Sequence, residues 1–319
     1  MRVLITGATG FIGRHVSAHF VSRGIAVRAV VRPESTHKAP AGVAITRAPL
    51  AAAALRDAFS GADSVVHLAG AVSELHSEIY TAVNIEGTRA VVEAAQAVGA
   101  RLIYISSLAA VGPASAAAPR AEGDPPNPLT PYGRSKLAAE EVVRRTSERG
   151  WTILRPATVY GPGDRAMLPL FRMANRGILP LLGRPGAAYT FVHVSDVVRA
   201  IDAAMDAHAS GDVFFVGHPR PVSAREILEA IRAAVGRHAR LIRVPRALAL
   251  VAVAASDIAG RITGRPLPLN RWRYVELSAE GFVCRVDRLR ERLGVVAAID
   301  LEPGMHETAT WYRREGWLK

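Results

Sequence analysis

The fold is decided near the start of the chain by the stretch Val3-Leu4-Ile5-Thr6-Gly7-Ala8-Thr9-Gly10-Phe11-Ile12-Gly13. A short strand-like run leads into three regularly spaced glycines and then into a helical segment. In such a unit the glycines permit a tight turn, close approach of the backbone to a pyrophosphate, and close packing of helix on strand. The helix N-terminus offers free N–H groups and a positive dipole end to the phosphates. The stretch predicts a dinucleotide-binding turn, with contacts from Gly7, Thr9, Gly10, Phe11, Ile12 and Gly13.

Strand-like and helical segments alternate through the first half of the chain. The expected strands are Val3–Thr6, Ala26–Val31, Val43–Thr46, Ser64–Leu68, Leu102–Ser106 and Thr152–Leu154. The expected helices between them are Ile12–Arg23, Tyr80–Val98 and Tyr132–Arg149. This βαβ alternation predicts an α/β fold with a doubly wound parallel sheet of the Rossmann type.

The second half is less regular and reads as mostly helical. The expected helices are Ala166–Arg176, Ser195–Ala207, Ala224–Val235, Ala247–Ile262 and Gly304–Glu315, and the expected strands are Val213–Val216 and Leu241–Val244. We expect residues 1–164 to form the dinucleotide-binding domain, with 191–217 returning to it, and 165–319 to form a smaller substrate-binding cap. The Gly- and Pro-rich segments Gly112–Pro131 and Gly260–Pro268 are expected to be ordered loops flanking a site.

Composition excludes several classes of protein. Half of the 319 residues are apolar, too many for a disordered chain. The longest apolar run, Ala247–Ala255, is too short to span a membrane, which takes about 20 residues. Cys284 is the only cysteine, so no intrachain disulfide or multi-cysteine metal site is expected. With no signal peptide ahead of Val3, we expect a cytoplasmic protein without a membrane partner or a metal.

The formal net charge of +12 does not indicate a nucleic-acid partner, because the basic residues are scattered and not interleaved with aromatic ones. Arginine dominates: of the 40 basic residues only Lys38, Lys136 and Lys319 are lysines. In a chain so poor in lysine, a lysine kept inside a motif is expected to serve there as an ammonium group.

Arg32 follows the second expected strand, at the place where an acidic residue would bind the ribose 2′-hydroxyl of NAD. An arginine there accommodates the 2′-phosphate of NADP instead, and Arg14 is near enough in sequence to assist. NADP(H) is therefore favoured. Glu34 lies two residues on and could still reach a ribose, so NAD(H) stays possible.

Tyr132-Gly133-Arg134-Ser135-Lys136 carries the chemistry. Residues four apart share one helix face, so the phenol and the ammonium group face the same space. A nearby cation stabilises the phenolate and lowers the pKa of the phenol. Lysine suits this role as a compact point charge. Ser107 precedes the pair by 25 residues, just beyond the fifth expected strand.

On these motifs the chain resembles the extended short-chain dehydrogenase/reductases of the NAD-dependent epimerase/dehydratase group. Further matching segments are His67–Gly70, Asn84–Thr88, Ser106–Ser107, Arg155–Gly163 and Phe191–Asp196. The tail around Cys284 and Trp311–Leu318 is similar to the 3β-hydroxysteroid dehydrogenase-like branch.

The resemblance implies a role for each matching residue. Tyr132 would be the general acid/base, Lys136 would lower its pKa and hold the nicotinamide ribose, Ser107 would bond the substrate oxygen, and Asn84 would order the site. His67 would support structure, and Cys284 would serve packing. The other cofactor contacts would come from Leu50, Leu68, Ala69, Gly70, Pro156, Thr158 and Val159.

Three departures from the family pattern narrow the function. Pro49 stands where an acidic residue commonly precedes the adenine-side Leu50, and Leu108-Ala109-Ala110 lacks the acid that dehydratases place after the serine. The arginine that often clamps a sugar diphosphate before Phe191 is also absent, although Arg165 and Arg184 could replace it.

We therefore expect an NAD(P)(H)-dependent oxidoreductase that transfers a hydride between nicotinamide and a carbonyl or secondary alcohol of a largely apolar small molecule. The apolar segment Ala247–Ala255 would cover the pocket. A nucleotide-sugar epimerase is the first alternative, and a non-catalytic dinucleotide-binding regulator is the second. The resemblance also implies a homodimer through the helices 80–98 and 132–149. Small apolar positions that would allow it are Val83, Ala90, Val91, Ala94 and Ala95.

Overall fold

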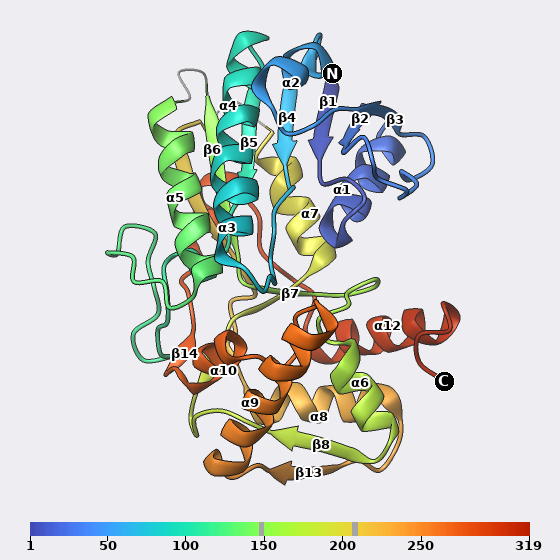
Figure 1. Cartoon of the computed structure of the whole chain (residues 1–319), viewed down its shortest axis with the longest axis vertical. Helices are drawn as coiled ribbons and strands as arrows, with labels where there is room; N and C mark the ends of the chain where they lie inside the picture. Colours follow the sequence, from blue (N-terminus) through green and yellow to red (C-terminus); the bar gives the residue numbers. More distant parts are fainter. Residues whose placement is uncertain (147–149, 206–209) are drawn as a thin grey trace.

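The computed structural model describes residues 1–146, 150–205 and 210–319. A large parallel sheet with helices on both faces forms the upper part in Figure 1, and helices with three small sheets form the lower part. The carboxyl ends of the central strands point down to the junction of the two parts. Among the described residues, no helix has the length and apolarity needed to cross a bilayer.

The large sheet has seven strands in the order β11-β6-β5-β4-β1-β2-β3, all parallel. They are β1 (Arg2–Thr6), β2 (Ala26–Val31), β3 (Ala44–Arg47), β4 (Ser64–His67), β5 (Arg101–Ile105), β6 (Trp151–Pro156) and β11 (Asp212–Val216). The central strands are buried on both faces, which explains their continuous apolar sequences. The strand order reverses between β1 and β4, and ligands of such sheets bind at that switch point. The predicted doubly wound α/β fold is confirmed.

Two helical layers cover the sheet. One layer contains α1 (Phe11–Ser22) and α7 (Val194–Ala203), packed around Phe20 and Val197. The other contains α2 (Ala52–Phe59), α4 (Gly87–Ala97) and α5 (Pro131–Thr146). Helix α2 was not predicted from the sequence, because its alanine-rich start gives no clear apolar periodicity and its N-cap is Ala51 rather than a polar residue.

The helix expected over Tyr80–Val98 is divided in the structure. A single turn, α3 (Ser77–Tyr80), leads into a π-helical turn, η1 (Thr81–Glu86), and only then into α4. π-helical turns are rare and are frequently found at functional sites. This one contains Asn84.

The lower part has its own core, formed mainly by α6 (Leu168–Asn175), α8 (Ala224–Val235) and α12 (Leu301–Arg314). Its short strands are β8 (Ile178–Leu181) with β13 (Arg240–Arg243), β12 (Val222–Ser223) with β9 (Ala188–Tyr189) and β14 (Gly281–Phe282), and β7 (Thr158–Tyr160) with β10 (Phe191–His193). Most of these strands are too short to show any periodicity in sequence, so all but β13 were missed.

The remaining helices are α9 (Arg246–Thr263), α10 (Arg271–Ser278) and α11 (Asp287–Leu293). The last two were not predicted. Helix α9 continues into the segment expected to be a loop from Gly260, and it ends at a left-handed Gly264. Residues 147–149 and 206–207, where two expected helices would have ended, lie outside the described residues.

Candidate active site

The glycine turn has the close contacts that its sequence predicts. Gly7 has a positive φ of 76°, and a Cβ there would lie 2.6 Å from the amide nitrogen of Ala69. A Cβ on Gly13 would lie 2.1 Å from the carbonyl oxygen of Gly7. Gly10 is the N-cap of α1 and presents no side chain to the space ahead of the helix. Any side chain at Gly7 or Gly13 would therefore displace the turn from β4 or from α1.

A second loop crosses the start of α1. His15 Nε2 lies 2.7 Å from the carbonyl oxygen of Pro162, and a Cβ on Gly163 would contact the Phe11 ring at 3.8 Å. Thr9, Phe11 and Ile12 are half-buried around the exposed Gly10. The N-terminus of α1 and the glycine turn ahead of it lie at the switch point of the sheet, and Gly10 has no side chain to fill the space there. These residues therefore fit the pyrophosphate of a dinucleotide.

His67 joins this turn to the π-helical segment. Thr88 Oγ1 donates to the carbonyl of Asn84 at 2.7 Å, so it must accept from His67 Nε2 at 3.0 Å. His67 Nδ1 then accepts from Thr6 Oγ1 at 2.6 Å. Burial, with the Lys136 charge, lowers the pKa of His67 to about 3, so the ring is neutral. The expected structural role of His67 agrees with these contacts.

Asn84 clamps the loop after β4 to α5. Its Oδ1 accepts from the Ala71 amide at 2.7 Å, and its Nδ2 donates to the Ala71 carbonyl and to Ser135 Oγ, each at 2.9 Å. The amide is fully satisfied within the chain. A Cβ on Gly70 would lie 3.2 Å from Asn84 Oδ1 and 3.8 Å from Lys136 Nζ, so this loop passes directly over the lysine.

Tyr132, Lys136 and Ser107 meet at the carboxyl end of β5. Lys136 is buried, its Nζ donates to the Ile105 carbonyl at 2.7 Å, and it lies 4.6 Å from the centre of the Tyr104 ring. Ser107 lies two residues beyond the end of β5 and caps a 3₁₀ turn, η2 (Leu108–Ala110), by accepting from the Ala109 amide at 3.2 Å. Tyr132 interacts with the Ser107 side chain from the first turn of α5.

The pKa values of the pair differ from the expectation. Burial raises the pKa of Tyr132 to about 12, and hydrogen bonding to Ser107 opposes this only in part. Burial lowers the pKa of Lys136 to about 8, while the Glu140 charge raises it. The expected low pKa of the phenol is not found, because the effect of burial exceeds the effects of the neighbouring groups.

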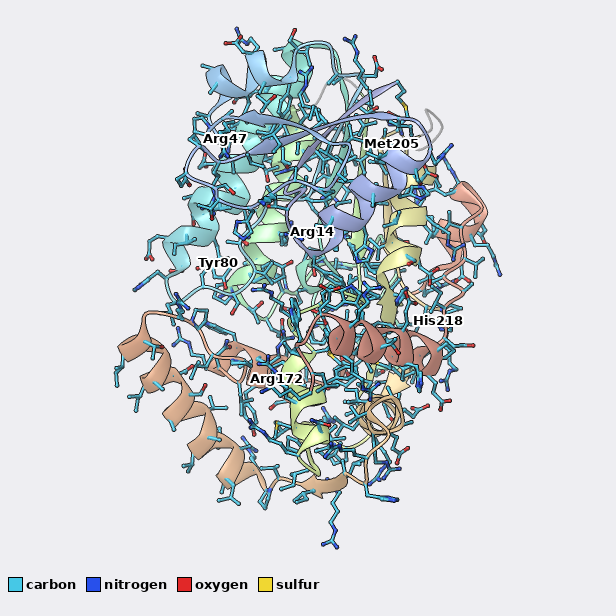
Figure 2. The ribbon with its side chains drawn as sticks, turned by 90° about the vertical axis from the view of Figure 1, so that its right-hand side faces the viewer. Arg14, Arg47, Tyr80, Arg172, Met205 and His218 are labelled. Atoms are coloured by element: carbon cyan, nitrogen blue, oxygen red, sulfur yellow. The ribbon has the colours of Figure 1, made fainter. Side chains whose placement is uncertain are left out.

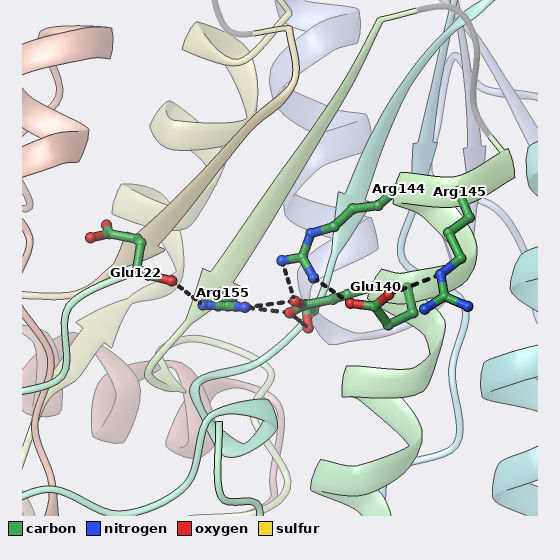
Figure 3. A network of polar contacts seen from close by, with 7 residues as sticks. Glu122, Glu140, Arg144, Arg145 and Arg155 are labelled. Carbon is green, nitrogen blue, oxygen red and sulfur yellow. Dashed lines mark hydrogen bonds and ion pairs between the residues drawn. The ribbon is translucent and has the colours of Figure 1, made fainter. Parts of the chain in front are cut away.

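One helical turn beyond Lys136, Glu140 belongs to an ion network that was not predicted from the sequence and is drawn in Figure 3. The Glu140 side chain has no exposed surface, and Arg155 donates two hydrogen bonds to its carboxylate, of 2.9 and 2.7 Å. Ser106 donates to the same carboxylate at 2.6 Å, and Arg144 at 3.0 Å. Because Tyr132, Lys136, Glu140 and Arg144 recur every four residues, one stripe of α5 carries both the pair and its support.

Helix α10 approaches the same site from the lower part. Arg134 of α5 lies 6.0 Å from the Trp272 ring of α10. The charges of Glu276 and Arg273, also on α10, act on the Tyr132 phenol. The Tyr80 ring lies 6.3 Å from the Tyr132 ring. No signal in the sequence links positions so far apart, so these residues were missed.

The end of β2 is arginine-rich. Arg32 Nε lies 3.5 Å from Glu34 Oε1, and both side chains are mostly exposed. Arg47, from β3, donates to the carbonyls of Pro33 at 3.1 Å and Ser35 at 2.9 Å and so fixes this loop. Arg14 donates to the Thr9 carbonyl at 3.0 Å. Figure 2 shows Arg14 and Arg47 on the side turned to the viewer.

The remaining predicted contacts lie around the same edge of the sheet. A Cβ on Gly87 would lie 3.1 Å from Leu50, which places Leu50 against α4. Leu68 and Ala69 follow β4 beside Gly7. Pro156 ends β6, and Thr158 and Val159 open β7, whose first amide donates to the Thr190 carbonyl at 3.3 Å. Cys284 is buried, and burial raises the pKa of its thiol to about 12, which agrees with a packing role.

Comparison with known proteins identifies the family. The model of the NAD dependent epimerase/dehydratase family matches residues 3–217. A ceramide reductase of Caulobacter vibrioides is 32% identical, over 99% of this chain and 96% of its own length. Sterol demethylase protein B of Methylococcus capsulatus is 29% identical over the whole of both chains. The structure of MoeE5 with UDP-glucuronic acid and NAD has 26% identity and a TM-score of 0.78, over 99% of this chain and 100% of that one.

These likenesses agree with the glycine turn, the sheet order and the Tyr-x-x-x-Lys pair. The resemblance drawn from the sequence is confirmed: the chain belongs to the NAD-dependent epimerase/dehydratase family and is an NAD(P)-dependent enzyme of the extended short-chain dehydrogenase/reductase type.

Proposed function

We propose that this enzyme reduces a carbonyl group of an apolar, lipid-like substrate to a secondary alcohol with NADP(H). The observation that carries the proposal is the pair of half-buried Tyr132 and buried Lys136 beside Ser107, next to the loop that Asn84 holds. The relatives named for a ceramide and for a sterol support an apolar substrate.

Tyr132 serves as the proton donor in this proposal. With a pKa of about 12 its phenol stays protonated at neutral pH and can protonate a developing alkoxide. Ser107, which interacts with the same phenol, holds the substrate oxygen within reach of the proton. Lys136 is charged below pH about 8 and stabilises the negative charge left on the phenol. When bound, the nicotinamide supplies the hydride.

The residues proposed to bind the cofactor lie at the same edge of the sheet, where the parallel strands have their carboxyl ends. Gly7, Gly10 and Gly13 would admit the pyrophosphate, and Lys136 would hold the nicotinamide ribose. Thr158 and Val159, just after Pro156, would face the nicotinamide amide. Arg32, on a loop fixed by Arg47, would take the 2′-phosphate, which favours NADP(H) over NAD(H).

The test is Tyr132→Phe, assayed for NADPH oxidation with 3-oxo lipids and 3-oxosteroids. We expect NADPH to bind as in wild type and turnover to fall by about 10²- to 10⁴-fold, because the variant lacks only the transferable proton. Tyr160→Phe is the matched control, since its hydroxyl donates to the Asp300 carbonyl instead. Unchanged turnover in Tyr132→Phe would remove this residue from the mechanism.

A nucleotide-sugar epimerase is the second candidate, favoured by the likeness to MoeE5, which was solved with UDP-glucuronic acid and NAD. It would use the same cofactor residues but would need a diphosphate clamp, for which Arg165 and Arg184 are the candidates. Thermal-shift measurements with UDP-, GDP- and dTDP-sugars distinguish the two. Strong stabilisation by one of these sugars, together with tightly retained NAD, would favour the epimerase.

A further inference from the structure

Helix α9 is apolar on two opposite faces, but only one face is covered. Residues Ala249, Val253 and Gly260 are buried and recur at helical spacing. Consecutive residues of an α-helix are about 100° apart around its axis. At this spacing a second set of apolar residues, here called the outer stripe, lies on the opposite side of α9. It consists of Leu248, Val251, Ala255, Ile258 and Ile262.

This outer stripe is open to solvent. The four large side chains in it, Leu248, Val251, Ile258 and Ile262, are 60–79% exposed. Among the described residues no element covers them, and Figure 2 shows α9 as the pale orange helix along the lower left edge of the molecule. A helix apolar all round is ordinarily buried, so a contiguous exposed stripe of this kind marks an interaction surface.

The charge around α9 identifies the kind of partner. Residues 237–273 contain eight arginines and a single acidic residue, Asp257. All eight arginines are exposed, and within the described residues only Arg273 has an ion-pair partner, Glu276. An apolar helix face flanked by unneutralised arginines is the pattern of helices that lie in the interface of an anionic bilayer.

The position of α9 connects this surface to the catalytic residues. A Cβ on Gly260 would lie 3.6 Å from Leu75, which belongs to the loop between β4 and α3. The next helix, α10, carries the charges that act on Tyr132. The covered face of α9 thus packs toward the site while its outer stripe faces away.

We propose that the outer stripe of α9, with the arginines that precede and follow it in the chain, docks the enzyme on an anionic membrane surface. The stripe enters the headgroup region, and the arginines pair with lipid phosphates. Docking goes beyond the proposed reductase activity and needs no turnover, so the two proposals can fail separately.

Sedimentation of the full chain with vesicles tests the proposal. We expect at least about tenfold tighter binding to phosphatidylcholine containing about one-third phosphatidylglycerol than to phosphatidylcholine alone, and weaker binding as salt rises. The triple variant Leu248→Ser, Val251→Ser, Ile258→Ser should lose about tenfold or more in affinity for the anionic vesicles. Arg261→Gln with Arg265→Gln should lose the preference for anionic lipid.

The matched control is Ile45→Ser with Val296→Ser, which replaces two side chains of 46% and 44% exposure outside α9. It should bind vesicles as wild type does, and circular dichroism should show that every variant is folded. Equal binding of wild type and the triple variant, or binding to neither vesicle, would overturn the proposal. A wild-type dimer that the triple variant converts to a monomer, without vesicle binding, would show that α9 is a contact between two copies.

Discussion

The pKa of the Lys136 ammonium group is set by burial and by the charge of Glu140, which act in opposite directions. Burial lowers its pKa to about 8, and the negative charge of Glu140, one helical turn away, raises it. Since Tyr132 stays protonated to a pKa of about 12, the group that titrates near neutrality is the lysine. We predict that kcat/KM for carbonyl reduction falls as the pH rises through about 8, because the neutral amine no longer stabilises the phenolate.

Glu140→Gln sharpens this prediction. Removing the carboxylate charge should lower the pKa of Lys136 further, so the fall in rate should move to lower pH. A pH–rate profile of both proteins measures the shift. A flat profile across this range in wild type, or the same midpoint in both proteins, would contradict the assignment of the titrating group to Lys136.

Arg32 is the residue that decides between the two nicotinamide cofactors. A charge-assisted contact with a phosphate is worth about 1.5–3 kcal/mol, which corresponds to roughly ten- to a hundredfold in affinity. We predict that NADPH binds tighter than NADH by this factor, that salt narrows the gap, and that Arg32→Asp reverses the order. Titration of cofactor fluorescence gives the four dissociation constants.

Glu34 competes for the same guanidinium group at 3.5 Å. Glu34→Gln should therefore strengthen NADPH binding a few-fold. Arg145→Asp, on an exposed part of α5, is the control and should leave the preference unchanged. Equal affinities of wild type for NADPH and NADH would mean that Arg32 points to solvent, and the preference would then become NAD(H).

Helix α5 and strand β6 are joined by the buried pair of Glu140 and Arg155. Removing one partner of a buried, hydrogen-bonded pair leaves an uncompensated charge, which costs about 3–5 kcal/mol. We predict that Arg155→Met lowers the free energy of unfolding by about this amount. The double variant Arg155→Met, Glu140→Leu should be less destabilised than Arg155→Met alone, because the buried carboxylate that has lost its partner is then removed as well.

Chemical denaturation of the single and double variants measures this effect. The exposed pair of Arg89 and Glu86 provides the control, and Arg89→Ala should cost under about 1 kcal/mol. If Arg155→Met proved as mild as the surface variant, the network would contribute little to stability.

At the scale of the whole molecule, four of the α4 residues expected at a dimer contact are not available for one. Ala90, Val91, Ala94 and Ala95 are buried within one chain, against α2 and the sheet, so they cannot form a dimer face. The outward side of the two helices instead carries charged and small residues, with Ala138 half-buried among them.

We predict a particle of twice 34.0 kDa by light scattering at micromolar concentration. Ala138→Arg should convert it to a folded monomer, because a long cation replaces a small residue at the centre of the outward face. A monomer mass for wild type would exclude the dimer.

The sequence by itself determined the features that depend on local geometry. The glycine turn from Gly7 to Gly13, the parallel βαβ order, and the shared helix face of Tyr132 and Lys136 follow from φ angles, periodicity and helical spacing, which neighbouring residues fix. For the same reason long helices such as Ala224–Val235 were predicted with their observed bounds.

Only the tertiary structure decided what depends on burial and on distant charges. The high pKa of Tyr132, the Glu140–Arg155 pair, the π-helical turn at Asn84 and the approach of α10 all join segments far apart in sequence. The same holds for α9, whose apolar segment Ala247–Ala255 was predicted to cover the pocket, although most of its residues are exposed. Hydrophobicity is a property of each residue, but which apolar face is covered depends on where the whole chain places it.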